Sequence, residues 1–418
     1  MTAPAERRGF KSLLTAGSEA TVTTVDPESL PPPAAAPAAT VPSDDETRVF
    51  EPSNPSLHES LPRGCALLTV TEDHEQPGHF HLGFYLGDYQ ESRKADIRSQ
   101  VPPRPLSAIA ERGRWKDDHD ELRNWWRELA RLRGWMHHLV GQPGARLIVW
   151  DNTGFQTPWE LYYVDKRLDG GGPHGWLGSL VEVIRWTSLM ETGRETRYTA
   201  VAARATGGVV VMETDEVRHA GVAHMADRYR PPTLKGPRGP LRSIDALLAA
   251  LDDPDLRFGL LLVHCHGINA TNANEFRLAG RTLNEVELAD MPALASTGAV
   301  VLLGACNTAR IVPVGPDSTR ATRSFAETFL RKGASTVIAT LGQVDLDHAH
   351  EFVFQLLDAE SGHRVSELLL AHRRRYADRL RKAPRGSEPY QAFFNSFMYV
   401  YFGNPETTLE ITGAGGAG

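Results

Sequence analysis

The sequence predicts an α/β protein with a mostly parallel sheet and helices on its faces. From residue 198 onward, short apolar runs that are typical of buried strands alternate with helical segments. Two of these runs, 260–263 and 300–303, are continuously apolar, as expected for strands that are buried on both faces. The chain shows no repeat with a period of about 20 to 50 residues, which excludes a solenoid.

Composition narrows the function classes. The chain has 418 residues, enough for two or three domains, and a net charge of -7, which argues against nucleic acid as the main partner. Three cysteines in this length are no disulfide framework and fit a reducing cytoplasm. We find neither an apolar run near 18 residues nor a secretory leader, so we expect a cytoplasmic protein without a membrane span.

The first part of the chain contains a disordered arm and then a folded region. Residues 1–48 are rich in Pro and Ala and have little to bury, which predicts the arm. Apolar runs at 65–70 and 79–86 predict a β-hairpin. A Trp-rich stripe over 118–140 predicts one helix whose tryptophans lie in the core, and residues 145–150 predict another strand.

The second part alternates strands and helices, and the Gly-rich residues 411–418 predict a flexible tail. Its predicted strands are 198–205, 209–212, 258–266, 300–303, 334–340 and 393–402. Its predicted helices are 215–228, 244–251, 319–332, 348–359 and 364–381.

Reactive side chains end two neighbouring strands of the predicted sheet. The first strand ends in His264-Cys265-His266-Gly267, and the second ends in Gly304-Ala305-Cys306. Parallel strands deliver their carboxyl ends to one crevice. A thiol becomes a nucleophile when a base removes its proton, and an imidazole can do so. We therefore predict a catalytic dyad of His266 and Cys306.

The small residues beside this dyad predict an oxyanion hole. Gly267 has no Cβ, so a substrate carbonyl can approach its backbone N–H, and the N–H of Cys306 is the natural second donor. Gly304 and Ala305 leave room for a peptide next to the nucleophile.

A zinc site is the alternative at the same place. His264, His266 and Cys306 could supply ligands, because residues two apart on a strand share a face. Tetrahedral zinc usually has closer ligand pairs and a fourth ligand, and the chain has no cysteine cluster. We expect neither a metal nor an organic cofactor.

The motifs resemble those of CHAT domains, caspase-fold cysteine peptidases related to separase and the caspases. The resemblance spans about residues 145–410, and its order and spacing are more specific than any single motif. It rests on Pro158-Trp159-Glu160-Leu161, His266-Gly267, Gly304-Ala305-Cys306-Asn307-Thr308, Ser324-Phe325-Ala326 with Lys332-Gly333-Ala334, Val337-Ile338, Val344-Asp345, Pro389 to Phe393, and Tyr401-Phe402-Gly403-Asn404-Pro405.

The resemblance implies a caspase-like fold with His266 as base, Cys306 as nucleophile, and the backbone amides of Gly267 and Cys306 as oxyanion hole. It also implies that residues 49–195 form a degenerate companion half without its own dyad, and that residues 196–410 form the catalytic domain. The chain departs from the family at Leu341-Gly342-Gln343, where relatives often carry a Trp, and this affects the shape of the pocket.

Two acidic residues are candidates for the pocket that selects the substrate side chain before the cleaved bond. Asp345 and Asp347 follow a strand predicted to neighbour the Cys306 strand. A carboxylate there would select Arg or Lys through a charge-assisted hydrogen bond, and we favour Asp345. The alternative is a helix-capping or solvated acid.

Two other charged features have structural interpretations. The run Arg373-Arg374-Arg375 near a helix end predicts a solvated face that the helix dipole favours. Glu160 could bond the backbone near the site.

These observations predict a cysteine endopeptidase that cleaves a protein substrate after a basic residue. The family resemblance implies a role in bacterial defence or programmed cell death, a separate activating protein, and, as one candidate substrate, a gasdermin-like protein. The alternative is a catalytically silent adaptor that keeps the caspase fold for binding. The presence of both His266 and Cys306 argues against it.

Overall fold

The computed structural model describes most of the chain after residue 60. The described residues are 61, 64–72, 79–87, 89–96, 113–128, 132–151, 153, 157–166, 171–187, 189–191, 194–196, 203–268, 276–313, 322–358, 362–383 and 385–412. The predicted arm 1–48 and residues 413–418 of the predicted tail lie outside them. Residues 52–418 belong to one compact unit.

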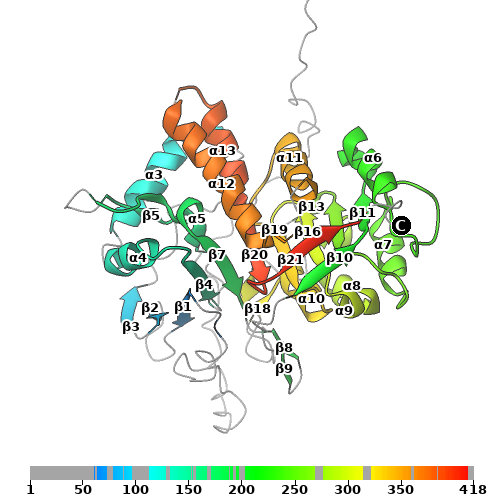
Figure 1. The fold of residues 1–418 in the computed structure, drawn as a ribbon, viewed down its shortest axis with the longest axis horizontal. Coiled ribbons are helices and arrows are strands. Elements are labelled where there is room, and N and C mark those ends of the chain that lie inside the picture. The colour runs from blue at the N-terminus through cyan, green and yellow to red at the C-terminus, as the bar shows by residue number, and fades with distance from the viewer. Residues whose placement is uncertain are drawn as a thin grey trace, which may run out of the picture. The chain divides into compact units, whose positions relative to one another are not determined.

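A ten-stranded sheet forms the framework of this unit (Figure 1). In spatial order its strands are β11 (Val209–Glu213), β12 (Leu260–His264), β16 (Val300–Gly304), β19 (Thr336–Thr340), β20 (Tyr399–Gly403), β7 (Glu182–Trp186), β4 (Arg146–Asp151), β1 (Cys65–Glu72), β2 (His79–Leu86) and β3 (Tyr89–Asp96).

The sheet is mostly parallel, but its direction reverses in the middle. Strands β11, β12, β16 and β19 run parallel to one another. The antiparallel step from β19 to β20 reverses the direction, which β7, β4 and β1 then keep. The carboxyl ends of β12 and β16 therefore lie at one edge of the sheet, and those of β4 and β7 lie at the opposite edge.

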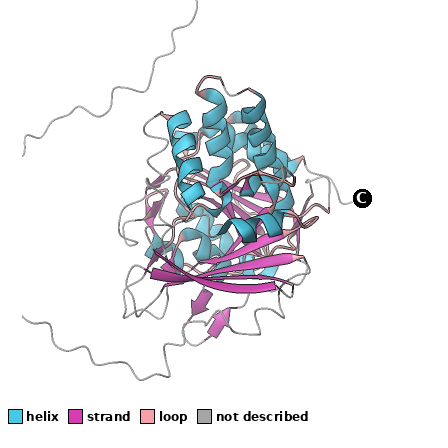
Figure 2. Cartoon of the chain, turned by 90° about the vertical axis from the view of Figure 1, so that its left-hand side faces the viewer, coloured by secondary structure: helices cyan, strands magenta, loops and turns pink. Residues whose placement is uncertain are grey.

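Helices pack against this sheet, as the side view shows (Figure 2). They are α3 (Trp115–Glu128), α4 (Arg133–Val140), α5 (Leu177–Leu180), α6 (Ala220–Arg228), α7 (Ile244–Leu251), α8 (Leu283–Leu288), α9 (Pro292–Thr297), α10 (Phe325–Arg331), α11 (Leu346–Leu357), α12 (Val365–Lys382) and α13 (Glu388–Met398). None of the helices in the described ranges is long and apolar enough to cross a membrane. The sheet and its helices confirm the predicted fold class.

Short elements complete the fold. They are β5 (Tyr163–Val164) with β6 (Gly175–Trp176), β8 (Leu189–Glu191) with β9 (Arg194–Thr196), β10 (Arg204–Gly207) with β21 (Thr408–Ile411), β13 (Gly267–Ile268) with β14 (Arg277–Leu278) and β15 (Arg281–Thr282), β17 (Val312–Pro313) with β18 (Thr322–Arg323), and the 3-10 helices η3 (Trp159–Leu161) and η4 (Asp215–Val217).

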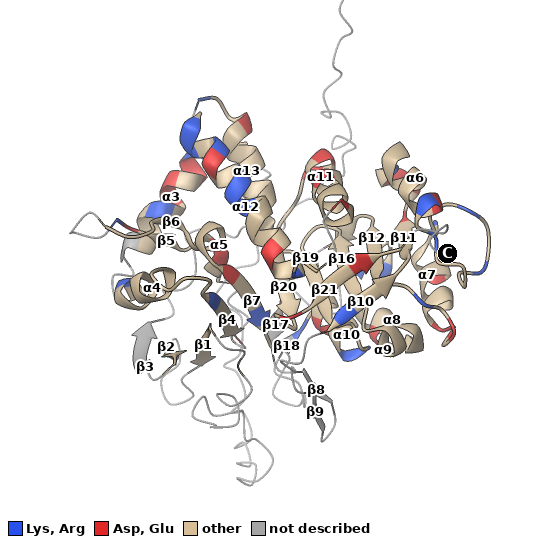
Figure 3. Cartoon of the chain, viewed as in Figure 1, with Lys and Arg blue, Asp and Glu red and all other residues tan. Residues whose placement is uncertain are grey.

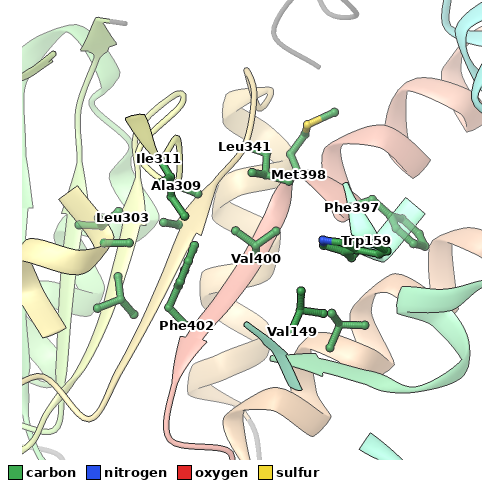
Figure 4. Close-up of a cluster of buried hydrophobic side chains, with 14 of the residues drawn as sticks. Val149, Trp159, Leu303, Ala309, Ile311, Leu341, Phe397, Met398, Val400 and Phe402 are labelled. Atoms are coloured by element: carbon green, nitrogen blue, oxygen red, sulfur yellow. The ribbon is translucent and has the colours of Figure 1, made fainter. Parts of the chain in front are cut away.

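One hydrophobic core crosses the predicted boundary between the two halves. Figure 4 shows part of it, with Val149 and Trp159 on one side of β20 and Leu303 on the other. Val400 and Phe402 of β20 belong to the same buried cluster. The division at residue 195 stays a prediction, and both the sheet and the core continue across it.

Several predicted elements have different bounds in the structure, and three of these differences have a clear physical reason. The Trp-rich stripe forms two helices, α3 and α4, and α10 begins at Phe325 because the Ser324 hydroxyl accepts the Glu327 N–H and caps it there. The predicted closing strand 393–402 is the end of helix α13 followed by β20. A helix buried on all sides is continuously apolar, so periodicity cannot distinguish it from a strand.

Candidate functional site

The predicted dyad residues follow the ends of two neighbouring parallel strands, β12 and β16. The two strands pair in parallel, with His264 opposite Gly304 as the last pair. Both strands are buried apolar runs, as expected for interior strands of the sheet. His266 lies two residues beyond the first strand end and Cys306 two residues beyond the second, at the same edge.

Gly267 lies against the backbone of Cys306. A Cβ at position 267 would lie 2.2 Å from the carbonyl oxygen of Cys306 and 3.2 Å from its N atom. No side chain fits at 2.2 Å from a backbone atom, so this close approach requires glycine. The structure therefore brings the backbone of Gly267, the residue after His266, against that of Cys306.

The three thiols of the chain differ in exposure. Cys65 and Cys265 are buried, whereas Cys306 is half-buried and His266 is exposed. Burial raises the pKa of Cys65 to about 11 and that of Cys265 to about 12. A thiol with such a pKa is almost entirely protonated at neutral pH and is a poor nucleophile. Cys306 is thus the thiol that the structure makes available.

A network of threonine hydrogen bonds holds the turn that carries Cys306. The Thr340 hydroxyl donates to the carbonyl of Ala305 at 2.6 Å, and the Thr308 hydroxyl donates to the same carbonyl at 3.0 Å. The Thr340 N–H donates in turn to the Thr308 hydroxyl at 3.2 Å. These buried bonds fix the residue before Cys306 to the end of β19. Sequence reasoning did not single out either threonine.

Asn307, directly after Cys306, has a left-handed backbone. Its φ is +60°, and its N–H donates to the carbonyl of Gly342 at 3.2 Å. Asn tolerates this conformation better than most residues, and such backbone is enriched at functional sites.

The two acidic candidates follow β19, which pairs with β16 as predicted. Asp345 caps helix α11, because its carboxylate accepts the Asp347 N–H at 3.1 Å. It also lies 3.4 Å from Nδ1 of His348, and this hydrogen bond lowers the pKa of Asp345. Its observed contacts are those of the helix-capping alternative. Both carboxylates are exposed, and a role in substrate selection remains a proposal.

Glu160 lies in a buried ion cluster. Arg185 of β7 donates to it at 2.9 and 2.5 Å, and Arg373 of α12 lies 4.0 Å away. Glu160 is fully buried and Arg373 is 1% exposed. Glu160 also accepts a hydrogen bond from its own backbone N–H, so the two arginines add to a backbone bond.

The Arg373 to Arg375 run is therefore not a wholly solvated face. Arg373 is buried, whereas the Arg375 guanidinium is more than half exposed and pairs with Glu351. In Figure 3, ribbon segments of basic and of acidic residues alternate on the helices around α12 and α13.

Among the described residues, one cluster could hold a metal ion, and it differs from the predicted alternative. Glu213, His264 and His350 place their ligand atoms within 4.8 Å of one another. His264 is 3% exposed, whereas His266 is exposed, because β12 ends at His264 and the two side chains no longer share a face. The zinc set of His264, His266 and Cys306 therefore does not form.

A cavity of about 380 Å³ lies elsewhere, beside α3 and α12. Its lining includes His119, Arg123, Tyr163, His174 and Arg374, and it contains neither dyad residue.

A family model for the CHAT domain matches residues 138–391, which is more than half of the chain. The chain belongs to the CHAT-domain family. No curated protein sequence matches it.

Two solved structures with low sequence identity are similar in fold to this CHAT chain. The Saccharomyces cerevisiae separase–securin complex matches it in two structures, with TM-scores of 0.47 and 0.50. In the first the identity is 10% and the alignment covers 83% of this chain; in the second these values are 8% and 82%. The match covers 30% of the separase chain in each. The structure with a TM-score of 0.50 supports the caspase-like fold.

Proposed function

We propose that this CHAT protein is a cysteine endopeptidase with His266 as base and Cys306 as nucleophile. The observation that supports this most is the close approach of Gly267 to the Cys306 backbone, next to an exposed imidazole. An adaptor that only binds has no need for an accessible thiol and a base. It also has no need for a glycine whose missing Cβ lets its backbone lie against that of the cysteine.

The reaction is acyl transfer to sulfur. Cys306 Sγ attacks the scissile carbonyl carbon while His266 takes the thiol proton. The N–H groups of Gly267 and Cys306 bind the oxyanion of the tetrahedral intermediate. His266 then gives its proton to the leaving amine, and a thioester forms. Water, activated by His266, hydrolyses the thioester and releases the thiol.

We further propose that the pocket selects a basic residue through Asp345, with Asp347 as the second candidate. A carboxylate that is already a helix cap keeps lone pairs for a substrate cation, and the Asp345 side chain is 43% exposed. A separate activating protein, a gasdermin-like substrate, a cytoplasmic location and a role in defence or cell death are proposed on the family resemblance alone.

The test is cleavage of a peptide–fluorophore library with Arg, Lys, Leu or Asp before the scissile bond. The wild type is compared with Cys306→Ala and with the matched control Cys65→Ala, which removes a buried thiol on β1. Each is assayed with and without lysate of the source cells, to supply an activator. We expect cleavage after Arg or Lys that only Cys306→Ala abolishes.

The outcomes separate the parts of the proposal. Cleavage after another residue that still needs Cys306 would remove the role of Asp345 and keep the peptidase. Silence in every condition, together with an unreactive Cys306, would favour the adaptor.

A further inference from the structure

A second cluster of functional groups is buried at the carboxyl ends of β11 and β12, two residues along the chain from His266. Glu213 ends β11, His264 ends β12 opposite Glu213 in the parallel register, and His350 comes from α11. The three side chains are 0%, 3% and 3% exposed. Nδ1 of His264 lies 3.7 Å from Oε1 of Glu213, and the two imidazole rings are 4.7 Å apart.

Three of the four imidazole nitrogens in this cluster lack a partner among the described residues. Nδ1 of His264 and both ring nitrogens of His350 make no hydrogen bond to any residue in the described ranges. Each buried polar atom without a partner costs about 1–3 kcal/mol. Three such atoms beside a buried carboxylate are rare in native proteins and require a physical explanation.

Other groups hold the carboxylate in place without satisfying the histidines. The backbone N–H of His219 donates to Oε1 of Glu213 at 3.1 Å, and Arg242 donates to Oε2 at 3.2 Å. His219 stacks on His350 with ring centroids 3.8 Å apart, and its own Nδ1 accepts the Gly221 N–H. Such outer contacts orient a ligating carboxylate in metal sites.

The spacing fits a shared ion better than a direct hydrogen bond. The 3.7 Å between His264 and Glu213 exceeds the usual hydrogen-bond distance. Two ligands of a tetrahedral zinc ion, each bound at about 2.0–2.1 Å, lie about 3.4 Å apart.

We propose that Glu213, His264 and His350 bind one divalent transition-metal ion, with Zn²⁺ as the best fit. Two imidazoles and one carboxylate form a known zinc ligand set that leaves a fourth position for water. Imidazole ligands disfavour Ca²⁺ and Mg²⁺, which prefer oxygen. The ion would connect α11 to the ends of β11 and β12, and through α11 would hold the Asp345 cap. The inference does not depend on peptidase activity.

The test measures metal binding by the full chain with Cys306→Ala, because a thiolate and His266 could themselves bind zinc. The chain is stripped with EDTA and titrated with Zn²⁺ in equilibrium dialysis, and with Co²⁺ in absorption spectroscopy. We expect one ion per chain and a Co²⁺ spectrum without a thiolate charge-transfer band. His350→Gln and His264→Gln should each weaken binding on the order of 100-fold.

A matched control is His372→Gln on α12. His372 is also a buried histidine, but its Nδ1 bonds to Gln355 at 2.8 Å and it lies outside the cluster. We expect the chain with His372→Gln to bind Zn²⁺ as tightly as the Cys306→Ala chain does. Equal binding in all four chains, or no binding of Zn²⁺, would overturn the proposal.

A second measurement covers variants that fail to fold. Saturating Zn²⁺ should raise the melting temperature of the Cys306→Ala chain by about 4 °C, whereas Mg²⁺ should leave it unchanged. A melting temperature that does not respond to Zn²⁺ would contradict the site.

Discussion

Each side of the sheet contains a pair of adjacent parallel strands, β4–β7 on one side and β12–β16 on the other. The residues at the carboxyl ends of these two pairs differ in kind. In the pair β4–β7 the last partners are Trp150 and Trp186, whose rings touch edge to face at 5.9 Å. In the pair β12–β16 the last partners are His264 and Gly304, and the chains continue to the dyad. Both pairs have the same architecture, so the fold alone does not make a site.

The difference lies in the volume at the strand ends. Two buried indoles fill the end of the β4–β7 pair, and the Trp186 N–H is satisfied by the carbonyl of Gly403. Gly304 contributes no side chain, which leaves His264 and the following turns room for polar groups. Packed side chains fill the end of the β4–β7 pair, whereas the chain after the β12–β16 pair carries the half-buried Cys306 and the exposed His266.

The largest expected effect comes from adding a side chain at Gly267, which lies against the Cys306 backbone. Gly267→Ala places a methyl group 2.2 Å from the Cys306 carbonyl oxygen, so the backbone must move. We expect kcat/KM to fall on the order of 100-fold or more, since small displacements in a site are costly. The control Gly304→Ala meets only a His264 side-chain atom at 3.2 Å and should lose about tenfold or less. Equal losses would break the comparison.

The second largest effect is expected in the ion cluster of Glu160, Arg185 and Arg373, which joins η3 and β7 to α12. Glu160→Gln leaves Arg185 and Arg373 buried without their partner charge, and should lower the free energy of unfolding by about 3–5 kcal/mol. The control Glu388→Gln removes an exposed ion pair with Arg379 and should cost less than about 1 kcal/mol. Urea unfolding measures both, and similar small losses would contradict the joining role.

The same cluster predicts a pH dependence. Burial alone would raise the pKa of Glu160, but the charge and hydrogen bonds of Arg185 outweigh it and lower this pKa. A lowered carboxyl pKa stabilises the fold above the unfolded value and less as pH falls through the folded one. The wild type should therefore lose more stability on acidification than Glu160→Gln does. Parallel losses would argue against an ionised Glu160.

Much of the fold and the residues of the candidate site were predictable from the sequence, for physical reasons. Buried strands such as β12 and β16 are continuously apolar, and the residues after them carry the chemistry, so His266, Gly267 and Cys306 stand out. The glycine was predictable because only a missing Cβ permits that approach.

The rest depends on contacts between segments far apart in the chain. His350 on α11 meets Glu213 on β11 only after folding, and no local spacing announces it. Arg373 looks like its exposed neighbours in sequence, but the position of Glu160 buries it. In helix α13 the polar residues Asn395 and Ser396 are buried together with their apolar neighbours, which hides the period of the helix.

A smaller effect is expected on the choice of the substrate residue before the cleaved bond. If Asp345 binds the substrate cation, Asp345→Asn should reduce cleavage after Arg relative to Leu by about tenfold or more. Asp347→Asn is the matched control. Asp347 lies two residues after Asp345 and is also exposed, and its substitution should change this ratio little. A ratio that moves only with Asp347 would transfer the role to it.

The smallest effect tests the turn that carries Cys306. Thr340→Val removes one buried hydrogen bond to Ala305 and should cost about 1–2 kcal/mol of stability, with a larger effect on kcat than on KM. Thr297→Val removes a hydroxyl that bonds only within α9 and should leave kcat unchanged. An equal drop in kcat in both variants would deny the positioning role.

The central claim is that one strand end exposes a reactive thiol, and alkylation of the three cysteines tests it most directly. The chain is treated with iodoacetamide at neutral pH, and labelling of Cys306, Cys65 and Cys265 is followed by mass spectrometry. We predict that Cys306 is labelled at least 100-fold faster than the two buried thiols, and that His266→Ala slows this labelling. Equally slow labelling of all three would contradict the peptidase and favour an adaptor.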